Sequence, residues 1–466
     1  MQCNKKKRLM KQVERFRARF LQSIGTVLTD VISQQSLLQS VIEEVGLYRE
    51  RIYGPLATLS LFIEQVLGAD HSCQDAVARG LSVRVALGQS TCSLNTGPYC
   101  KARTRLPLSL LRRLAREVAR RLCADQPAIW RWRGREVKLI DGTTVSMPDT
   151  RANQARFPQS GGQQPGLGFP LARLVAVVSL STGAALEWAI DACKGKKTGE
   201  TALLWRLLPT FTRGDIVIAD SYYCGYFMIA GLIAQGVDIL MPQHHLRLTD
   251  FRRGQRLGVR DHRVTWARPQ RPDWMDEATY ATMPESLTMR EVRAAGRTLV
   301  TTLVDACTVT KPALAELYAT RWQVELDLRA IKTVMQMDIL RCKSPAMVTK
   351  EIAVHLLAYN LVRAVMAQAA CLGHVLPRHL SFKAALQLIR AFEENLRHAP
   401  HGRWATRQAY LLAGIARLRL PHRPGRVEPR AVKRRPQTHP LLTRPRHVLR
   451  AQLLKQQQAH ITAGLR

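Results

Sequence analysis

The sequence predicts an α/β protein with a mixed sheet, preceded by a helical region and interrupted by a β-rich segment. Three observations predict this class. Apolar residues recur with a period of about 3.6 through much of residues 1–125, which is typical of helices. Segments rich in β-branched residues alternate with helical ones between residues 126 and 242, and helical spacing returns in residues 306–400.

The N-terminal region, residues 1–125, contains four predicted helices, at 13–24, 33–45, 53–68 and 107–123. The last has an arginine stripe opposite an apolar face, and more basic residues precede it. The basic side chains concerned are Lys101, Arg103, Arg105, Arg112, Arg116 and Arg120. They form either a solvated basic face or a DNA-binding element, and the charge of the whole chain favours DNA binding.

The first part of the predicted core covers residues 126–242. A strand is expected within 135–149, then a loop at 159–170 and a hairpin over 172–191 that turns at 181–183. A helix at 196–211 follows, and then a strand, a helix and a strand at 214–220, 226–236 and 237–243. Because a strand–helix–strand unit pairs its strands in parallel, the sheet should be mixed.

The rest of the chain divides into three further segments. Residues 243–305 are polar, basic and turn-rich before they alternate as strands, so we expect a β-rich insertion. Residues 306–400 should complete the core with helices, including one at 317–337. Residues 401–466 form a basic C-terminal tail. From Pro421 it is rich in Pro and Arg, with Glu428 as its only acid, and we expect this part to be disordered or bound along DNA.

Charge is the main compositional signal. The 466 residues include 70 Lys and Arg against 35 acids, a formal charge of +35 and a pI near 10.7. A polyanion, double-stranded DNA above all, is the partner that such a charge indicates. We expect no membrane span and no secretion signal, since no apolar run of about 20 residues is evident. Ten cysteines without a CxxC pair predict reduced thiols, no zinc site and a cytoplasmic location.

Three carboxylates stand out from the surface acids. Asp141 follows the apolar run VKLI, and Asp220 follows IVIA. Aspartates at the carboxyl ends of buried strands lie where open α/β sheets form their crevice, although either one alone could simply cap a turn. Glu325 lies on the predicted helix 317–337, in a polar row that borders its apolar face.

Converging carboxylates require cations. Three of them predict a site for Mg²⁺ or Mn²⁺, with two ions that activate a hydroxyl and stabilise the leaving oxygen of a phosphodiester. Arg321 and Lys332, on either side of Glu325, supply positive charge for phosphate oxygens, and Tyr318 supplies a hydroxyl. Trp322 is either a base-stacking residue or a core residue, and its position on the helix leaves both interpretations open.

The spacing Tyr318–x2–Arg321–x3–Glu325–x6–Lys332 resembles the YREK signature of bacterial insertion-sequence DDE transposases of the insertion-sequence-four, transposon-five-like family. The resemblance runs from about residue 135 to 365. It implies a ribonuclease-H-like catalytic core with a metal-binding triad of Asp141, Asp220 and Glu325. It also implies that Tyr318, Arg321 and Lys332 hold phosphates near the transposon end.

The resemblance implies a cut-and-paste reaction by a homodimer assembled on DNA. A nick at the terminal repeat frees a 3′-hydroxyl, which attacks the opposite strand and finally the target. In transposon-five-like relatives, a tryptophan shortly before the glutamate helix holds a flipped base during hairpin formation. Residues 294–305 contain none, and Trp266 and Trp274 lie earlier, so the hairpin step stays open.

Two alternatives remain. One is a catalytically inactive DNA-binding relative that acts as a repressor. The other is a haloacid-dehalogenase-like phosphatase, because LIDGTTV resembles that family's nucleophile motif and GDIVIAD its acidic motif. Thr143 stands where the phosphatase needs a second aspartate, and we expect Asp215 to be a turn residue at the start of a strand.

Overall fold

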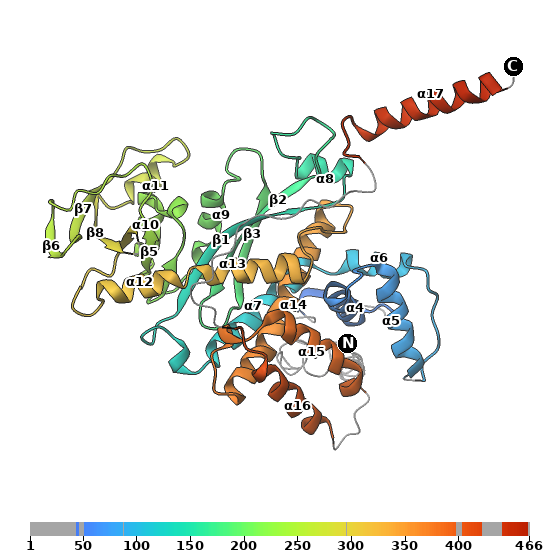
Figure 1. Ribbon diagram of the computed structural model, residues 1–466, viewed down its shortest axis with the longest axis horizontal. Helices are drawn as coiled ribbons and strands as arrows, with labels where there is room; N and C mark the ends of the chain where they lie inside the picture. Colours follow the sequence, from blue (N-terminus) through green and yellow to red (C-terminus); the bar gives the residue numbers. More distant parts are fainter. Residues whose placement is uncertain are drawn as a thin grey trace, which may run out of the picture.

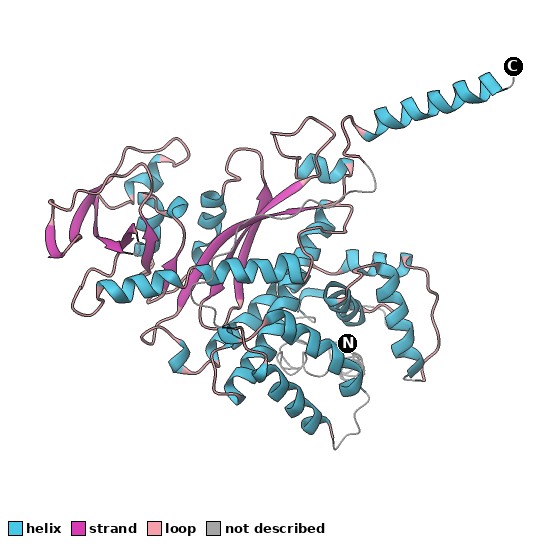
Figure 2. Ribbon diagram, in the orientation of Figure 1, coloured by secondary structure: helices cyan, strands magenta, loops and turns pink. Residues whose placement is uncertain are grey.

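One sheet of nine strands runs through the molecule, with helices on both of its faces (Figures 1 and 2). The computed structural model describes residues 43–45, 51–86, 88–294, 296–397, 403–421 and 440–464. The predicted helix at 13–24 and most of the one at 33–45 lie outside the described residues. The mixed α/β class is confirmed.

The first five strands are those that the sequence predicts. They are β1 (Val137–Ser146), β2 (Leu171–Ser179), β3 (Ala185–Ala192), β4 (Ile216–Ile218) and β5 (Asp238–Pro242). Strands β1, β2 and β3 pair antiparallel, whereas β4 lies parallel to β1 and β5 parallel to β4. Gly183 makes the hairpin turn possible with a φ of +78°.

Residues 243–305 extend this same sheet. Their elements are β6 (Gln255–Gly258), β7 (Asp261–Ala267), α11 (Glu277–Ala281), β8 (Ser286–Ala294) and β9 (Arg297–Thr301). Strand β9 pairs with β5, which gives the order β3-β2-β1-β4-β5-β9-β8-β7-β6. The fully buried Arg290 binds both carboxylate oxygens of Asp261 and also donates to the backbone oxygen of Val309. This buried pair ties the added strands to the segment before the next helix.

Helices cover the two faces of the sheet with different apolar clusters. One face packs on α9 (Glu200–Leu207), which the short turn Leu208–Thr210 follows, and on α10 (Tyr226–Ala234). The other packs on α12 (Lys311–Ala319) and α13 (Trp322–Arg329). Alternate residues of β1 divide between these clusters, because successive side chains of a strand point to opposite faces.

The single helix predicted at 317–337 is instead broken. Thr320 and Arg321 form a turn between α12 and α13, in which the Thr320 hydroxyl donates to the Leu317 oxygen at 2.6 Å. Residues Ala330–Val334 then form a π-helical turn. A constant 100° per residue therefore does not hold across this segment, and the predicted polar row is not one straight stripe.

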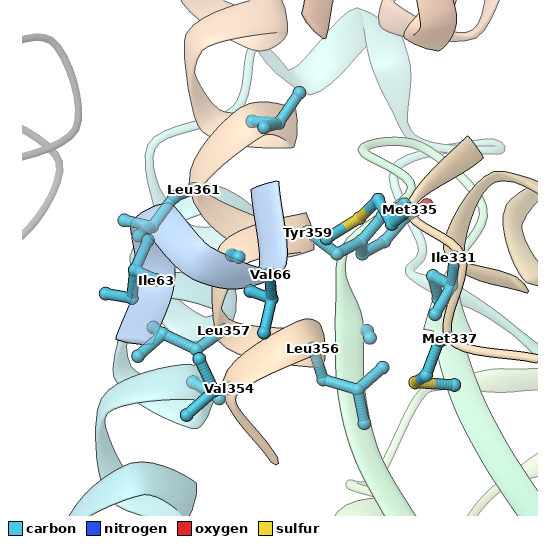
Figure 3. Packing of buried hydrophobic residues seen from close by; sticks show 14 of the residues in the cluster. Ile63, Val66, Ile331, Met335, Met337, Val354, Leu356, Leu357, Tyr359 and Leu361 are labelled. Atoms are coloured by element: carbon cyan, nitrogen blue, oxygen red, sulfur yellow. The ribbon is translucent and has the colours of Figure 1, made fainter. Parts of the chain in front are cut away.

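The helical N-terminal region packs on the long helix α14 (Pro345–Leu372). Its described helices are α4 (Pro55–Leu67), α5 (Cys73–Ala86), α6 (Gly97–Arg105) and α7 (Leu108–Ala124). Figure 3 shows Ile63 and Val66 of α4 beside Leu357 of α14, with Met335 and Met337 farther along the same cluster.

Helix α14 corrects the expectation that no apolar segment is long enough to cross a membrane. By length and composition it passes that test. However, 94% of its most apolar window is buried inside the fold, which is typical of a core helix. Helix α8 (Arg151–Arg156) and the turn Pro377–His379 contact α14, and the other short elements are the turns Ala128–Trp130 and Ser221–Tyr223.

The C-terminal segment is more ordered than its composition predicts. Helix α15 (Phe382–Arg397) was expected, but α16 (Trp404–Arg417) lies in the predicted tail. Leu411 and Ile415 of α16 are fully buried against the main core, so their helical spacing outweighs the basic composition. Helix α17 (Arg446–Gly464) projects from the body (Figure 1), where a disordered or DNA-bound tail was predicted. It contains no proline and one terminal glycine, so nothing in it opposes a helix.

Candidate active site

Strand register brings Asp141 and Asp220 together. Leu139 of β1 is the parallel partner of Ile218, the last residue of β4. Asp220 lies just past the end of β4, whereas Asp141 lies within β1, which continues to Ser146, so the prediction of a strand-end position is right only for Asp220. Since neighbouring strands are about 4.8 Å apart, the two aspartates start from adjacent backbone positions at the carboxyl end of β4. Asp220 also caps the turn that follows it, because its Oδ1 accepts from the Tyr222 amide at 2.8 Å.

Glu325 approaches the same point from α13. Leu139 faces the α12–α13 cluster and Ile140 the opposite one, so Asp141 lies on the α13 side. Helix α13 packs on β1. Arg321, at the start of α13, donates to Glu325 Oε1 one helical turn away.

The electrostatics of Asp141 join these groups into one site. The pKa of Asp141 is raised to about 6, mainly by burial. Within this net shift, the Gly142 amide, 2.8 Å from Oδ1, and the Arg321 guanidinium lower the pKa, while the negative charges of Asp220 and Glu325 raise it. The three predicted carboxylates therefore lie within electrostatic reach of one another.

The other residues of the predicted polar row differ in their burial and in their contacts. Tyr318 is 7% exposed, and burial raises its pKa, while Arg321 and Arg297 lower it. Lys332 lies in the π-helical turn and has no ion-pair partner among the described residues. Trp322 is 50% exposed, which excludes the core interpretation. Arg297 of β9, 5.8 Å from the Tyr318 ring, is a cation that the sequence reasoning missed.

The chemistry of the donors fits hard divalent ions. Carboxylate oxygens are the ligands that Mg²⁺ and Mn²⁺ prefer. Burial, and to a lesser extent the negative charges of Asp220 and Glu325, raise the pKa of Asp141, and a bound cation would favour its ionised form. Among the described residues, no three His, Cys, Asp or Glu side chains are already gathered around one ion position. The ion pair of Glu325 with Arg321 is one reason, because it turns that carboxylate toward its own helix.

Arg103 corrects one predicted DNA contact. It is 8% exposed, and its guanidinium donates to Gln65 Oε1 at 3.3 Å and to Cys73 Sγ at 3.1 Å. It also lies over the rings of Phe62 and Tyr99. Its role is to join α4, α5 and α6, whereas Lys101 and Arg105 are exposed on the surface.

The arginine stripe of α7 is engaged in contacts within the protein. Arg112 donates to the Trp188 oxygen and lies 4.9 Å from the Trp188 ring, and Arg116 pairs with Glu187 of β3. Arg120 pairs with Glu117 at 3.0 Å. All three arginines line a cavity of about 1250 Å³ between α7 and the β3 edge, and this cavity also contains acidic side chains. Their charge is therefore partly neutralised in place.

Asp327 is a second residue whose role the sequence did not reveal. It lies two residues after Glu325 and is fully buried. Its carboxylate accepts from Arg363, from Arg378 at 2.6 and 2.7 Å, and from the Tyr359 hydroxyl at 2.9 Å. The available signal in the sequence was a charged residue on the inner side of α13. Asp327 fixes that helix to α14 and to the turn Pro377–His379.

The structure separates the two aspartates of the phosphatase-like motif GDIVIAD. Asp215 lies before β4, and Asp220 lies after it, at the other end of the strand. Asp215 accepts from the Thr212 amide at 2.7 Å and pairs with the buried Lys138 at 2.7 Å. It is a structural turn residue, as the sequence predicts.

Comparisons with known proteins show what the chain resembles. The family described as "Transposase DDE domain" matches residues 132–361, which contain all three carboxylates. The transposase InsG of insertion sequence element IS4 from Escherichia coli strain K12 is 29% identical over 347 residues, covering 70% of this chain and 76% of InsG. A solved structure of piggyBac transposase, in a synaptic complex with hairpin DNA, aligns over 88% of each chain with 10% identity and a TM-score of 0.41. The chain is therefore a DDE transposase, an enzyme that cleaves DNA, and it is similar in sequence to the transposase of IS4.

Proposed function

We propose that Asp141, Asp220 and Glu325 form the catalytic triad of this transposase, in a ribonuclease-H-like core. The observation that carries the proposal is the meeting of Asp141 of β1 and Asp220, just past β4, with Glu325 of α13 at one electrostatic site. The strand order β3-β2-β1-β4-β5, with an antiparallel first half, supports the ribonuclease-H-like assignment. Residues 243–305 are then an insertion that lengthens the core sheet, between core parts at 126–242 and 306–400.

The cofactor that we propose is a pair of Mg²⁺ or Mn²⁺ ions held by the triad. When bound, these ions would polarise the attacked phosphodiester and lower the pKa of the attacking hydroxyl. Within the protein, Glu325 must turn away from Arg321 to take part. The guanidinium that this releases lies beside the site and can bind a phosphate oxygen through paired hydrogen bonds.

The DNA path is proposed from the surrounding side chains. Tyr318, Arg321 and Lys332 would hold phosphates of the transposon end, and the exposed Trp322 would stack on an unpaired base. The helical N-terminal region, through Lys101 and Arg105, and the basic C-terminal segment would bind flanking DNA. The α7 arginines would take part only by exchanging their present partners.

The reaction that follows is cut-and-paste transposition. The enzyme would bind the terminal inverted repeats, nick one strand, use the freed 3′-hydroxyl to form a hairpin, and join the reopened end to target DNA. Since both ends must be cut together, we propose a homodimer assembled on DNA in the cytoplasm, without membrane association. An inactive repressor is the alternative function, but all three carboxylates are present.

The test is a strand-cleavage assay on a labelled duplex that carries the terminal repeat and flanking DNA. With Mg²⁺, the proposal predicts a nick at the repeat boundary, followed by a hairpin on the element end. Asp220→Asn should bind the duplex but produce neither product. Binding without cleavage by the unaltered chain would support the repressor instead. Cleavage with a linear second product would overturn the hairpin step alone.

A further inference from the structure

A fourth carboxylate, that of Glu200, lies against the catalytic strand on the face opposite Glu325. Glu200 is the first residue of α9, and α9 packs on the sheet face that Ile140 and Gly142 share. A Cβ built on Gly142 would lie 2.4 Å from Glu200 Cδ and 2.6 and 2.7 Å from its two oxygens. The carboxylate therefore rests directly on the backbone of the residue after Asp141.

The same carboxylate is also tied to the turn after Asp220. The Tyr223 hydroxyl donates to Glu200 Oε2 at 3.1 Å. Tyr223 is fully buried and ends the turn Ser221–Tyr223, which Asp220 caps. Burial, followed by the negative charge of Glu200, raises the pKa of Tyr223, so the phenol stays protonated as a donor.

We propose, on the basis of the proposed triad, that Glu200 is a positioning residue for Asp141 and Asp220. Through Gly142 it fixes the backbone of one aspartate, and through Tyr223 the turn that orients the other. Arg173, whose Nε lies 3.9 Å from Glu200 Oε1, holds the carboxylate from its other side. Glu200 thereby sets the spacing at which the two aspartates receive metal.

Gly142 has a specific place in this arrangement. Its φ is not in the left-handed region, so the glycine is required by space and not by backbone conformation. The atoms that a Cβ would meet are the end of the flexible Glu200 side chain. Gly142→Ala should therefore displace the Glu200 carboxylate without disturbing the strand. This variant distinguishes the effect of the carboxylate's position from the effect of its presence.

The experiment measures Mn²⁺ binding to the full chain by calorimetry, and by the rise in melting temperature that Mn²⁺ produces. Residues that orient metal ligands typically contribute 10–100-fold in metal affinity, so Glu200→Ala and Tyr223→Phe should each weaken binding within that range. The double variant should bind Mn²⁺ no more weakly than the weaker single variant. Glu200→Ala already removes the hydrogen bond that Tyr223→Phe removes. Glu200→Gln keeps an oxygen for Tyr223 and should recover most of the affinity.

Tyr226→Phe is the matched control. Tyr226 is also buried, but its hydroxyl donates to Pro284 at 2.7 Å, away from the site, so Mn²⁺ affinity should not change. Unaltered affinity in Glu200→Ala would overturn the inference and leave the triad intact. Loss of affinity in both Glu200 variants with normal affinity in Tyr223→Phe would also overturn it, because Glu200 would then bind metal directly. A wild-type chain that binds no Mn²⁺ would contradict the metal centre itself, and the inference with it.

Discussion

Asp141→Asn should make the metal-free protein more stable at neutral pH while it abolishes cleavage. The pKa of the Asp141 carboxyl is raised from 3.8 to about 6, mainly by burial. Each pKa unit corresponds to about 1.4 kcal/mol, so the ionised carboxylate costs the folded state about 3 kcal/mol. Asparagine carries no charge and keeps an oxygen for the Gly142 amide, so it removes the cost and retains the hydrogen bond.

The pH dependence distinguishes this cause from others. Below pH 3.8, Asp141 is protonated in both the folded and unfolded chains, and the cost is absent. Between pH 3.8 and about 6 the unfolded chain ionises first, so wild-type stability falls relative to the variant, and above pH 6 the difference is constant. Urea unfolding in EDTA at several pH values from 4 to 8 measures this difference.

The control for this prediction is Asp273→Asn, at an exposed position, which should leave the pH dependence of stability unchanged. Added Mn²⁺ should stabilise the wild type and have much less effect on Asp141→Asn, because the charge that attracts the ion is gone. A variant that is no more stable than the wild type at pH 7.5 would refute the buried-carboxylate argument. A gain that does not vary with pH would do the same.

Three further predictions concern other parts of the molecule. Asp327→Ala should destabilise the fold by about 3–5 kcal/mol, because it leaves two buried guanidinium groups without their carboxylate. Denaturant unfolding measures this loss, and a loss below about 1 kcal/mol would contradict the role of Asp327. Trp322→Ala should leave first-strand nicking intact and reduce hairpin formation, and equal loss of both steps on sequencing gels would argue against base stacking. Arg103→Met should lower the melting temperature without changing the salt dependence of DNA affinity, whereas Lys101→Glu should lessen that dependence while leaving the melting temperature unchanged.

The strands of the core could be predicted because their signals are local. The run before Asp141 is apolar and β-rich, and the turn at Gly183 separates two such runs. The strand–helix–strand order predicts the parallel pairing of β4 with β5, but it does not place Asp141 beside Asp220. What it does not contain is their register, which the pairing of Leu139 with Ile218 supplies.

The wrong predictions have two physical causes, which are tertiary contacts that outweigh a local pattern and local turns that no glycine or proline marks. Arg103 looked like part of a basic surface, but Gln65 and Tyr99 enclose it from distant positions in the chain. The helix at 317–337 breaks at Thr320, where no glycine or proline marks the turn. The sequence assigns no role to Glu200, and only the fold places it against Gly142.

The central claim is that Glu325 completes a metal-dependent cleavage site with Asp141 and Asp220. The most direct measurement compares the wild type with Glu325→Gln on a terminal-repeat duplex in Mg²⁺, with Glu316→Gln, an exposed glutamate of α12, as the matched control. Glu325→Gln should bind the duplex as tightly as the wild type without cleaving it, while Glu316→Gln should cleave normally. Cleavage by Glu325→Gln at the wild-type rate would contradict the assignment of the triad.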